Sequence, residues 1–362
     1  MRPETEAQLS EAIRDARAPL RIVGGGTRPV GADLSGTALH TGGLRGVSLY
    51  EPAALTLVVR AGTPLAEVEA LIAAEGQRLP FEPVRWGPVL GAAGESTIGG
   101  VVAANVSGPR RIQAGACRDS LIGVRFVDGS GAVVKNGGRV MKNVTGYDLV
   151  KLMAGSWGTL GVLSELSFKL LPAPAEQATL ILPDLDPAAA VPALSAALGA
   201  PYDVTGAGWL PGTGAMVRIE GLSESVSYRA GRLAVLLAPF GRVIEMRDGA
   251  AALWRDLGEV APFHGATGDL WRFSVKPGDA PGIVARLGFP VVLDWGGGLV
   301  WALVPEGTDA RALAAPFAGH ATRMRGSGAG AFHPEPAPVA ALSAGLRAQF
   351  DPRAILNPGR MG

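Results

Sequence analysis

The chain has 362 residues, enough for two domains with a substantial core. Its 33 Lys and Arg residues nearly balance 32 Asp and Glu residues, and the net charge of +1 excludes a general attraction to nucleic acid. The one cysteine, Cys117, excludes an internal disulfide and a cysteine cluster for zinc or an iron–sulfur centre, and it favours a cytoplasmic setting.

The first part of the chain predicts strands and helices that alternate around glycine-rich loops. Thr5 and Gln8 have the spacing of a capping box and start the first helix, while Asp128 and Gly129 open a hairpin turn. The sequence contains no uninterrupted run of about 18 apolar residues, so no membrane-spanning helix is expected. The expected elements are helix 6–16, strands 20–22 and 55–59, helix 63–76, strands 122–127 and 132–135, helix 148–153 and strand 162–171.

Pro172 and Pro174 mark a domain border, because proline ends a strand and alanine-rich helices alternate with strands beyond it. There the pattern βαββαβ occurs twice, joined by a helical connector at 250–257, and predicts one largely antiparallel sheet with helices on one side, an α+β fold. The strands are 179–182, 203–209, 215–220, 242–246, 270–275, 290–295, 299–304 and 320–325, and the helices 187–199, 223–238, 279–287 and 308–317. The three predicted parts of the chain are domains 1–172 and 176–345 and a tail, 346–362, that docks back on the first domain.

Two stretches of small residues, 24–31 and 94–108, predict a site for a large phosphate-containing cofactor. Glycine has no Cβ, so backbone N–H groups there can approach a flat ring or a diphosphate. Pro29 stands where a dinucleotide fingerprint needs glycine, and Ala32 and Asp33 replace the Lys and Ser or Thr of a nucleotide-triphosphate loop. What remains is an anion nest for a diphosphate, with a plain tight turn as the alternative.

Four glycine-containing motifs follow one another in a recognisable order: Gly-Gly-Gly-Thr at 24–27, Thr-Ile-Gly-Gly at 97–100 with Asn105 and Gly108, Gly-Thr-Leu-Gly-Val at 158–162 and Leu-Asn-Pro-Gly at 356–359. With them the chain resembles FAD-binding proteins of the vanillyl-alcohol-oxidase (PCMH) type. That resemblance implies a two-lobed FAD domain followed by an antiparallel α+β cap domain. Within this superfamily, segments 108–111, 141–148 and 152–156 resemble the FAD-binding subunits of bacterial glycolate oxidases.

The resemblance also implies which residues contact FAD. The diphosphate is expected on the first glycine loop, and the flavin and ribityl groups on the second and third, with the tail closing the open side. The implied cofactor-binding residues are Gly24, Gly25, Gly26, Thr27, Arg28, Gly94, Thr97, Ile98, Gly99, Gly100, Asn105, Gly158, Gly161, Val162 and Asn357. No histidine lies in the first loop to tether the flavin, so FAD is expected to be non-covalent; Cys117 is expected to be a packing residue rather than a thioether link.

Oxidation of a 2-hydroxy acid needs a base for the hydroxyl proton and a cation for the carboxylate. His320, at the start of the last predicted strand, is the candidate base, and Arg272, between two aromatic residues of another strand, is the candidate cation. A solvent-exposed sheet face is the alternative for Arg272, and Arg110 or Arg111 are other candidates for the cation or for a partner contact. We find no metal-binding cluster of histidine and glutamate in the second domain and predict no metal site.

Taken together, the resemblance implies the smaller flavin subunit of a glycolate oxidase, which converts glycolate to glyoxylate by oxidising a CH–OH group. It also implies a complex with a larger FAD-containing subunit and an iron–sulfur subunit, through which the chain would reach the inner face of the cell membrane. Two alternatives stay open. One is a self-sufficient flavin-dependent 2-hydroxy-acid dehydrogenase that uses His320 and Arg272; the other is a structural subunit that holds FAD without a redox role.

Overall fold

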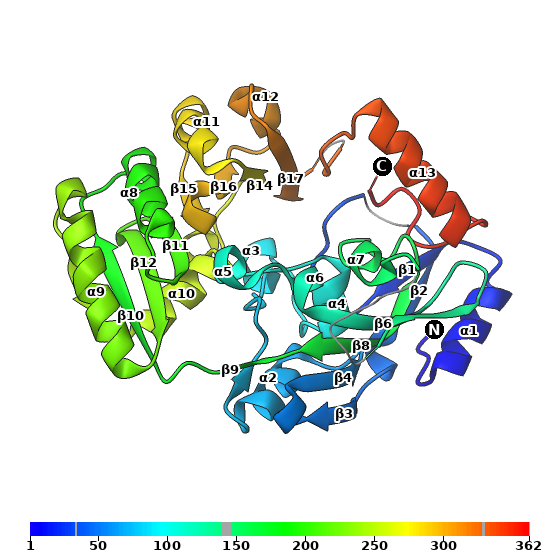
Figure 1. The fold of residues 1–362 in the computed structure, drawn as a ribbon. Coiled ribbons are helices and arrows are strands. Elements are labelled where there is room, and N and C mark those ends of the chain that lie inside the picture. The colour runs from blue at the N-terminus through cyan, green and yellow to red at the C-terminus, as the bar shows by residue number, and fades with distance from the viewer. Residues whose placement is uncertain (33–34, 139–145, 328–329, 362) are drawn as a thin grey trace.

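The computed structural model of the chain describes residues 1–32, 35–138, 146–327 and 330–361. Figure 1 shows two lobes side by side: the elements up to residue 172, blue to green, form one with the red C-terminal segment, and the elements of residues 176–325, green to orange, form the other. Residues 141–145 of the glycolate-oxidase-like segment 141–148 lie outside the described residues.

The first lobe, which we call the FAD lobe, is built on a five-stranded antiparallel sheet of order β3-β4-β8-β6-β7, beside a parallel pair of β1 and β2. Its strands are β1 (Leu20–Val23), β2 (Thr37–His40), β3 (Val47–Glu51), β4 (Thr56–Arg60), β5 (Gln77–Arg78), β6 (Leu121–Val127), β7 (Val133–Gly137), β8 (Val162–Lys169) and β9 (Leu171–Pro172). Its helices are α1 (Glu6–Asp15), α2 (Leu65–Ala73), α3 (Gly87–Leu90), α4 (Ile98–Ala103), α5 (Arg111–Ala114), α6 (Cys117–Ser120) and α7 (Leu149–Met153). The predicted capping box of Thr5 and Gln8 starts α1.

The second lobe, the cap lobe, is one eight-stranded antiparallel sheet of order β13-β10-β12-β11-β15-β16-β14-β17. Its strands are β10 (Glu176–Leu182), β11 (Val204–Leu210), β12 (Gly214–Gly221), β13 (Ile244–Met246), β14 (Asp269–Val275), β15 (Val291–Asp294), β16 (Leu299–Val304) and β17 (Gly319–Arg325). Its helices are α8 (Pro187–Gly199), α9 (Ser223–Leu237), α10 (Ala250–Glu259), α11 (Ala280–Leu287) and α12 (Ala310–Ala314), and α13 (Ala337–Phe350) returns to the FAD lobe. The α+β fold and both βαββαβ units are therefore confirmed.

Side chains alternate across the cap sheet, so its two faces pack against different parts of the protein. One face packs under α8, α9, α11 and α12 and holds residues such as Val217, Ile219 and Phe273. The other face turns to the FAD lobe, where Met216 and Trp301 share one core with Phe81 of the FAD lobe. The cap sheet therefore covers the FAD lobe with a mixed apolar and polar surface.

Several elements differ from the sequence prediction. The segment 94–108, expected as a loop whose backbone faces a ligand, contains α4, because the Thr97 hydroxyl accepts a hydrogen bond from the Gly100 N–H at 3.2 Å and caps the helix. The short strands β2 and β3 and the helix α13 were not predicted. In α13 no residue is buried, although Val339, Leu342 and Leu346 recur at the helical spacing i, i+3, i+7. Because α13 also runs across position 345, the domain limits stay a prediction.

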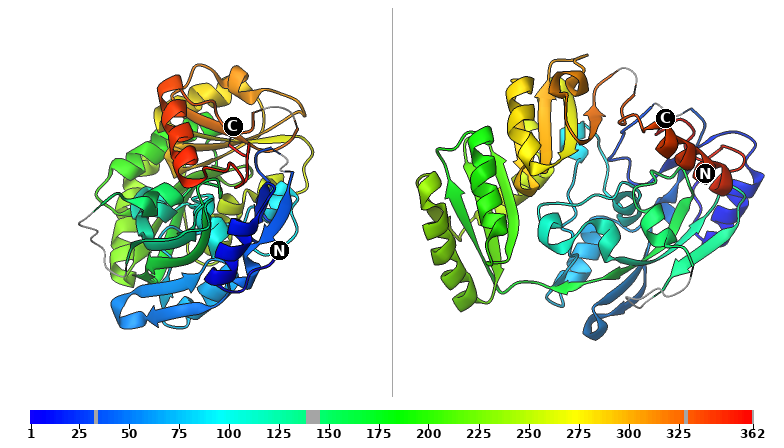
Figure 2. Two further views of the ribbon diagram at one scale, coloured as in Figure 1. Left: turned by 90° about the vertical axis from the view of Figure 1, so that its right-hand side faces the viewer. Right: turned by 45° about the horizontal axis from the view of Figure 1, so that its top comes forward.

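The tail and the start of the chain lie together in both views of Figure 2. Leu356 forms a parallel bridge with Leu20, at the start of β1. The Arg353 guanidinium donates to the carbonyls of Ile13 and Gly129 and fixes the tail on α1 and on the β6–β7 turn. The two ends of the sequence thereby build one side of the FAD lobe.

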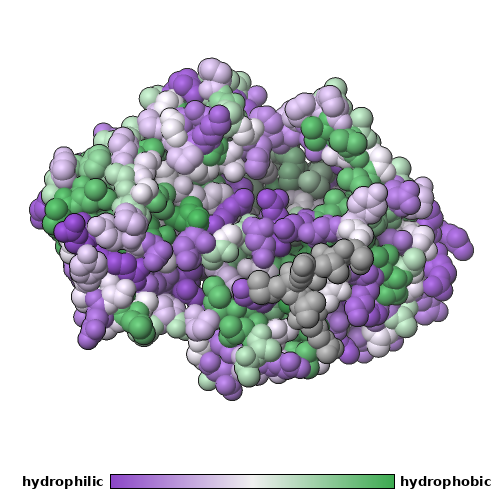
Figure 3. All heavy atoms as spheres, in the orientation of Figure 1, coloured by the Kyte–Doolittle hydropathy of each residue, from purple (hydrophilic) through white to green (hydrophobic). Residues whose placement is uncertain are grey.

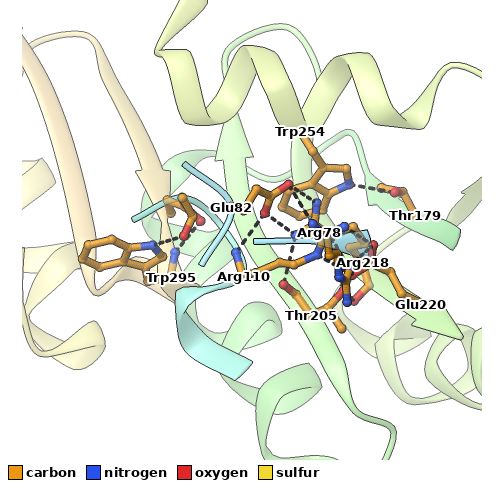
Figure 4. A network of polar contacts seen from close by, with 11 residues as sticks. Arg78, Glu82, Arg110, Thr179, Thr205, Arg218, Glu220, Trp254 and Trp295 are labelled. Carbon is orange, nitrogen blue, oxygen red and sulfur yellow. Dashed lines mark hydrogen bonds and ion pairs between the residues drawn. The ribbon is translucent and has the colours of Figure 1, made fainter. Parts of the chain in front are cut away.

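A buried network of ion pairs joins the two lobes (Figure 4). Arg218 and Glu220, on β12, have side chains only 1% and 2% exposed. The Arg218 guanidinium donates to both carboxylate oxygens of Glu82, at 2.9 and 2.8 Å, and stacks on Trp254, 4.5 Å from the ring centroid. The Arg110 Nε donates to Glu220 Oε2 at 2.8 Å.

Charge balance keeps this interlobe network ionised. Burial raises the pKa of Glu220, but the hydrogen bond from Arg110 and the charges of Arg218, Arg110 and Arg78 outweigh burial and lower it to about 2. The Arg78 Nη1 lies 3.3 Å from Glu220 Oε1. A buried ion pair of this kind adds little over an apolar substitute, but loss of one partner leaves a charge without a counter-charge.

We predict that Arg218→Met destabilises the chain by about 3–5 kcal/mol, because Glu82 then stays buried without the cation that bonds both of its oxygens and Glu220 loses one of its three nearby cations. Urea unfolding of the purified protein measures the change. Arg242→Met is the matched control, since Arg242 pairs with Asp184 on the surface with side chains 66% and 69% exposed; it should cost less than about 1 kcal/mol. Equal effects of the two substitutions would contradict this role of the network.

Candidate functional site

One cleft of the FAD lobe collects most of the predicted cofactor residues. It is formed by the loop after β1, by α4, by the segment before β8 and by the tail, so segments far apart in the sequence meet there. The predicted residues that line it are Gly24, Gly25, Gly26, Thr27, Arg28, Gly99, Gly100, Gly158, Gly161, Val162 and Asn357. Sequence reasoning missed Arg21, Trp157 and Arg360, although Arg360 follows the Asn357-Pro358-Gly359 motif directly.

The glycines of the cleft and of the segment behind it are required for two different reasons. A Cβ on Gly25 would lie 1.6 Å from the Glu95 carbonyl oxygen, and one on Gly94 would lie 2.2 Å from the Gly25 carbonyl oxygen. These two loops therefore pack main chain against main chain. Gly26, with φ at +72°, and Gly158, with φ at +74°, instead adopt the left-handed conformation that glycine tolerates.

The charged side chains that the structure places along the cleft are all positive. Arg21, Arg28 and Arg360 line it, and no acidic side chain does among the residues that the structure describes. Arg28 is 9% exposed; its Nη1 donates to Thr27 Oγ1 at 3.3 Å, and its Nε is buried without a partner. Burial lowers the pKa of Arg28 to about 10, so the guanidinium stays charged at neutral pH.

Arg360 adds a second orphaned donor to the cleft. Its Nη2 donates to the Arg28 carbonyl oxygen at 3.0 Å, while its Nε is buried without a partner among the described residues. Its guanidinium also lies 5.5 Å from the centroid of the Trp157 ring. Buried cations with open donors beside a glycine loop fit an anionic group such as the diphosphate of FAD.

Asn357 fastens the tail across the cleft. The residue is 1% exposed, its Oδ1 accepts from the Ile22 N–H at 2.7 Å, and its Nδ2 donates to the Trp157 carbonyl at 2.8 Å. A Cβ on Gly158 would lie 2.9 Å from that Nδ2. Asn357 therefore holds β1 and the Trp157–Gly158 turn at a fixed separation along the cleft wall.

Four predicted cofactor residues, Gly94, Thr97, Ile98 and Asn105, do not line the cleft. Gly94 packs on the first loop and Thr97 caps α4. Ile98 is fully buried in the core. The Asn105 Oδ1 accepts from the Arg118 N–H at 3.1 Å, which orders the chain between α4 and α6. The geometry gives these residues a supporting position behind the cleft.

Arg272 and His320 lie outside the cleft, on the face of the cap sheet that turns to the FAD lobe. The strand register pairs Arg272 with Thr322 and Ser274 with His320, so the two candidates lie on one face in adjacent rows. Desolvation by the surrounding protein and then the charge of Arg272 lower the pKa of the His320 imidazole. His320 is therefore mainly neutral at neutral pH and able to accept a proton.

The remaining candidates, Arg110, Arg111 and Cys117, also lie outside the cleft. Arg110 belongs to the interlobe network, whereas Arg111 stacks on Trp295. Cys117 is fully buried, and burial raises the pKa of its thiol, which fits a packing residue. Among the described residues, no group of three or more His, Cys, Asp and Glu side chains could hold a metal ion, and no helix is long and apolar enough to cross a membrane.

Comparison with known proteins agrees with this geometry. A family model described as an FAD binding domain matches residues 1–137. The glycolate oxidase subunit GlcE of Escherichia coli K12 is 36% identical over 357 residues, which cover 98% of this chain and 95% of that protein. The chain belongs to the family of this subunit. FAD is therefore its cofactor, and the chain is an FAD-binding oxidoreductase similar to GlcE.

More distant relatives share part of the chain or the fold alone. The D-lactate dehydrogenase of Anaerostipes hadrus is 43% identical over 88 residues, 24% of this chain and 18% of that protein. Among solved structures, an alkyldihydroxyacetonephosphate synthase superposes with a TM-score of 0.69 at 16% identity, covering 99% of this chain and 75% of that one. This likeness shows that the two chains share a fold.

We predict that Gly25→Ala lowers the affinity for FAD by about tenfold or more, equivalent to about 1.4 kcal/mol, because the new Cβ pushes the first glycine loop away from Glu95. Flavin absorbance of the purified protein, titrated with FAD, measures the loss. Gly42→Ala is the control, since a Cβ on Gly42 would have nothing within 4 Å. Full FAD affinity in Gly25→Ala would contradict the assignment of this loop.

Proposed function

We propose that the chain is the FAD-holding subunit of an oxidoreductase assembly that acts on the CH–OH group of small 2-hydroxy acids such as glycolate. The observation that carries the proposal is the cleft lined by three arginines and glycine loops, in a chain that matches GlcE over nearly its whole length. GlcE is a subunit of a glycolate oxidase, which supports an assembly here as well. A larger FAD-containing subunit and an iron–sulfur subunit, with attachment to the inner face of the membrane through them, are the partners we propose.

Each part of the cleft has a task in holding the cofactor. The backbone of residues 24–28, with Arg28 and Arg360, would bind the diphosphate, and α4 with Gly158 and Gly161 would border the flavin. Bound FAD supplies the acceptor for the hydride that leaves the CH–OH carbon. We propose a non-covalent site, because no histidine lies in the first loop and Cys117 is buried with a raised pKa.

A second candidate function is supported by Arg272 and His320. On one sheet face they would provide a cation for a substrate carboxylate and a neutral imidazole that accepts the hydroxyl proton. With both groups in this chain, it would be a self-sufficient dehydrogenase. A purely structural subunit is the remaining alternative, and it needs neither group.

Anaerobic mixing of the FAD-loaded chain with glycolate separates these functions. We expect about one FAD per chain, released by acid precipitation, and bleaching of the flavin absorbance by glycolate only when co-purified partner subunits are present. Bleaching of the isolated chain would favour the self-sufficient dehydrogenase. A chain that binds no FAD would contradict the proposal altogether.

A further inference from the structure

Arg272 sits in a box of three tryptophans at the boundary between the lobes. Its guanidinium carbon lies 5.2 Å from the ring centroid of Trp295, 5.8 Å from that of Trp86 and 5.9 Å from that of Trp301. These three indoles are 6%, 4% and 2% exposed. Trp86 comes from the FAD lobe, and Trp295 and Trp301 come from the cap lobe, so the box exists only where the lobes meet.

A second guanidinium, from the FAD lobe, contacts the Trp295 wall of this box. Arg111, the first residue of α5, places its guanidinium 4.4 Å from the centroid of the Trp295 ring. The neighbouring Arg110 is held by Glu220, and Trp295 Nε1 donates to the Gly108 carbonyl at 3.1 Å. These contacts fix α5 against the cap sheet, and hydrophilic side chains gather over α5 and α6 between the lobes (Figure 3).

Neither cation of the box has a carboxylate partner in the part of the chain that the structure describes. No hydrogen bond or ion pair joins the guanidinium of Arg111 or Arg272 to an acidic group, and the Nε of Arg272 is buried without a partner. Burial and then the nearby charge of Arg111 lower the pKa of Arg272 to about 10, so both groups stay cationic at neutral pH. The charge of Asp119 raises the pKa of Arg111 against the lowering by burial, and Asp294 does the same for Arg272, but neither carboxylate bonds to these guanidinium groups, so their donors stay open to an added anion.

Asp294 is the acidic group that acts on Arg272 through its charge. It is 2% exposed, and its Oδ1 accepts the Trp295 N–H at 2.7 Å. Burial raises its pKa to about 7; Glu82 also raises it, whereas the Trp295 hydrogen bond and the charges of Arg218 and Arg272 lower it. Asp294 is therefore only partly ionised at neutral pH and does not neutralise both arginines.

We propose that Arg111 and Arg272 together bind the carboxylate of a small 2-hydroxy acid in the tryptophan box. The planar guanidinium fork matches a carboxylate, and the surrounding indoles reduce solvent screening of the contact. The identity and the small size of the acid rest on the proposed function, while the negative charge of the ligand is argued from the two cations of the box. Arg111 is the new member of the site, and it makes binding depend on the contact between the lobes.

The test titrates the FAD-loaded chain with glycolate, with neutral glycolamide and with inorganic phosphate, followed by tryptophan fluorescence. We expect saturable binding of glycolate, none of glycolamide, and weaker binding of phosphate. Arg272→Gln and Arg111→Gln should each weaken glycolate binding by about tenfold or more while the FAD content stays unchanged. Arg323→Gln is the matched control, because Arg323 lies over Trp271 on the opposite face of the same sheet and should leave glycolate binding unchanged.

A fourth variant moves the affinity in the opposite direction. Asp294→Asn keeps the oxygen that accepts the Trp295 N–H but removes the competing charge. Because Asp294 is ionised above its pKa, this variant should bind glycolate more tightly than the parent at about pH 8 and equally at about pH 6. A purely structural role of the box would produce no such pH dependence.

The outcomes also separate this inference from the proposed function. A chain that takes up no FAD contradicts the proposed function. A chain that takes up FAD but binds no glycolate, or binds it equally well with Arg272→Gln and Arg111→Gln, overturns the carboxylate site alone. If Arg272→Gln or Arg111→Gln fails to fold, the other variant and Asp294→Asn still test whether the box binds the carboxylate.

Discussion

The buried ion pairs of Glu82 with Arg218 and of Arg110 with Glu220 are the contact on which the rest of the structure depends. They hold one face of the cap sheet against the FAD lobe, since Arg218 and Glu220 alternate with the apolar residues of β12 that face α8 and α9. Next to them, Trp295 is fixed on Gly108. The position of the tryptophan box therefore follows from this network.

The buried arginines fall into two groups, those bonded to a carboxylate and those that are not. The second group indicates where anionic ligands bind. Arg218 has carboxylates within bonding distance, so its charge is neutralised inside the protein. Arg28 and Arg272 have a buried, unpartnered Nε and no carboxylate bonded to their guanidinium among the described residues, whereas Arg78, whose Nε is also unpartnered, bonds Glu220. Since an uncompensated buried charge is costly, the unpaired group points to an anion that arrives from outside. Arg28 points to the cofactor and Arg272 to a small acid.

Much of the fold could be predicted from the sequence, because two signals were local. The period-two alternation of the cap strands and the turn residues between them marked both βαββαβ units. The signals that failed depended on tertiary contacts. Nothing in the sequence near Gly25 indicates that a Cβ at this position would collide with the Glu95 carbonyl oxygen. Arg111 could not be paired with Arg272, because the lobe contact joins residues far apart in the chain.

The cleft with Arg28 and Arg360 is the place where we expect FAD to bind in this chain. An experimental structure of the FAD-loaded protein tests this claim most directly. We expect the diphosphate within hydrogen-bonding distance of the backbone amides of residues 24–28, with at least one guanidinium of the cleft bound to it. A diphosphate bound elsewhere in the protein, with the Arg28 and Arg360 donors still unpaired, would contradict the claim.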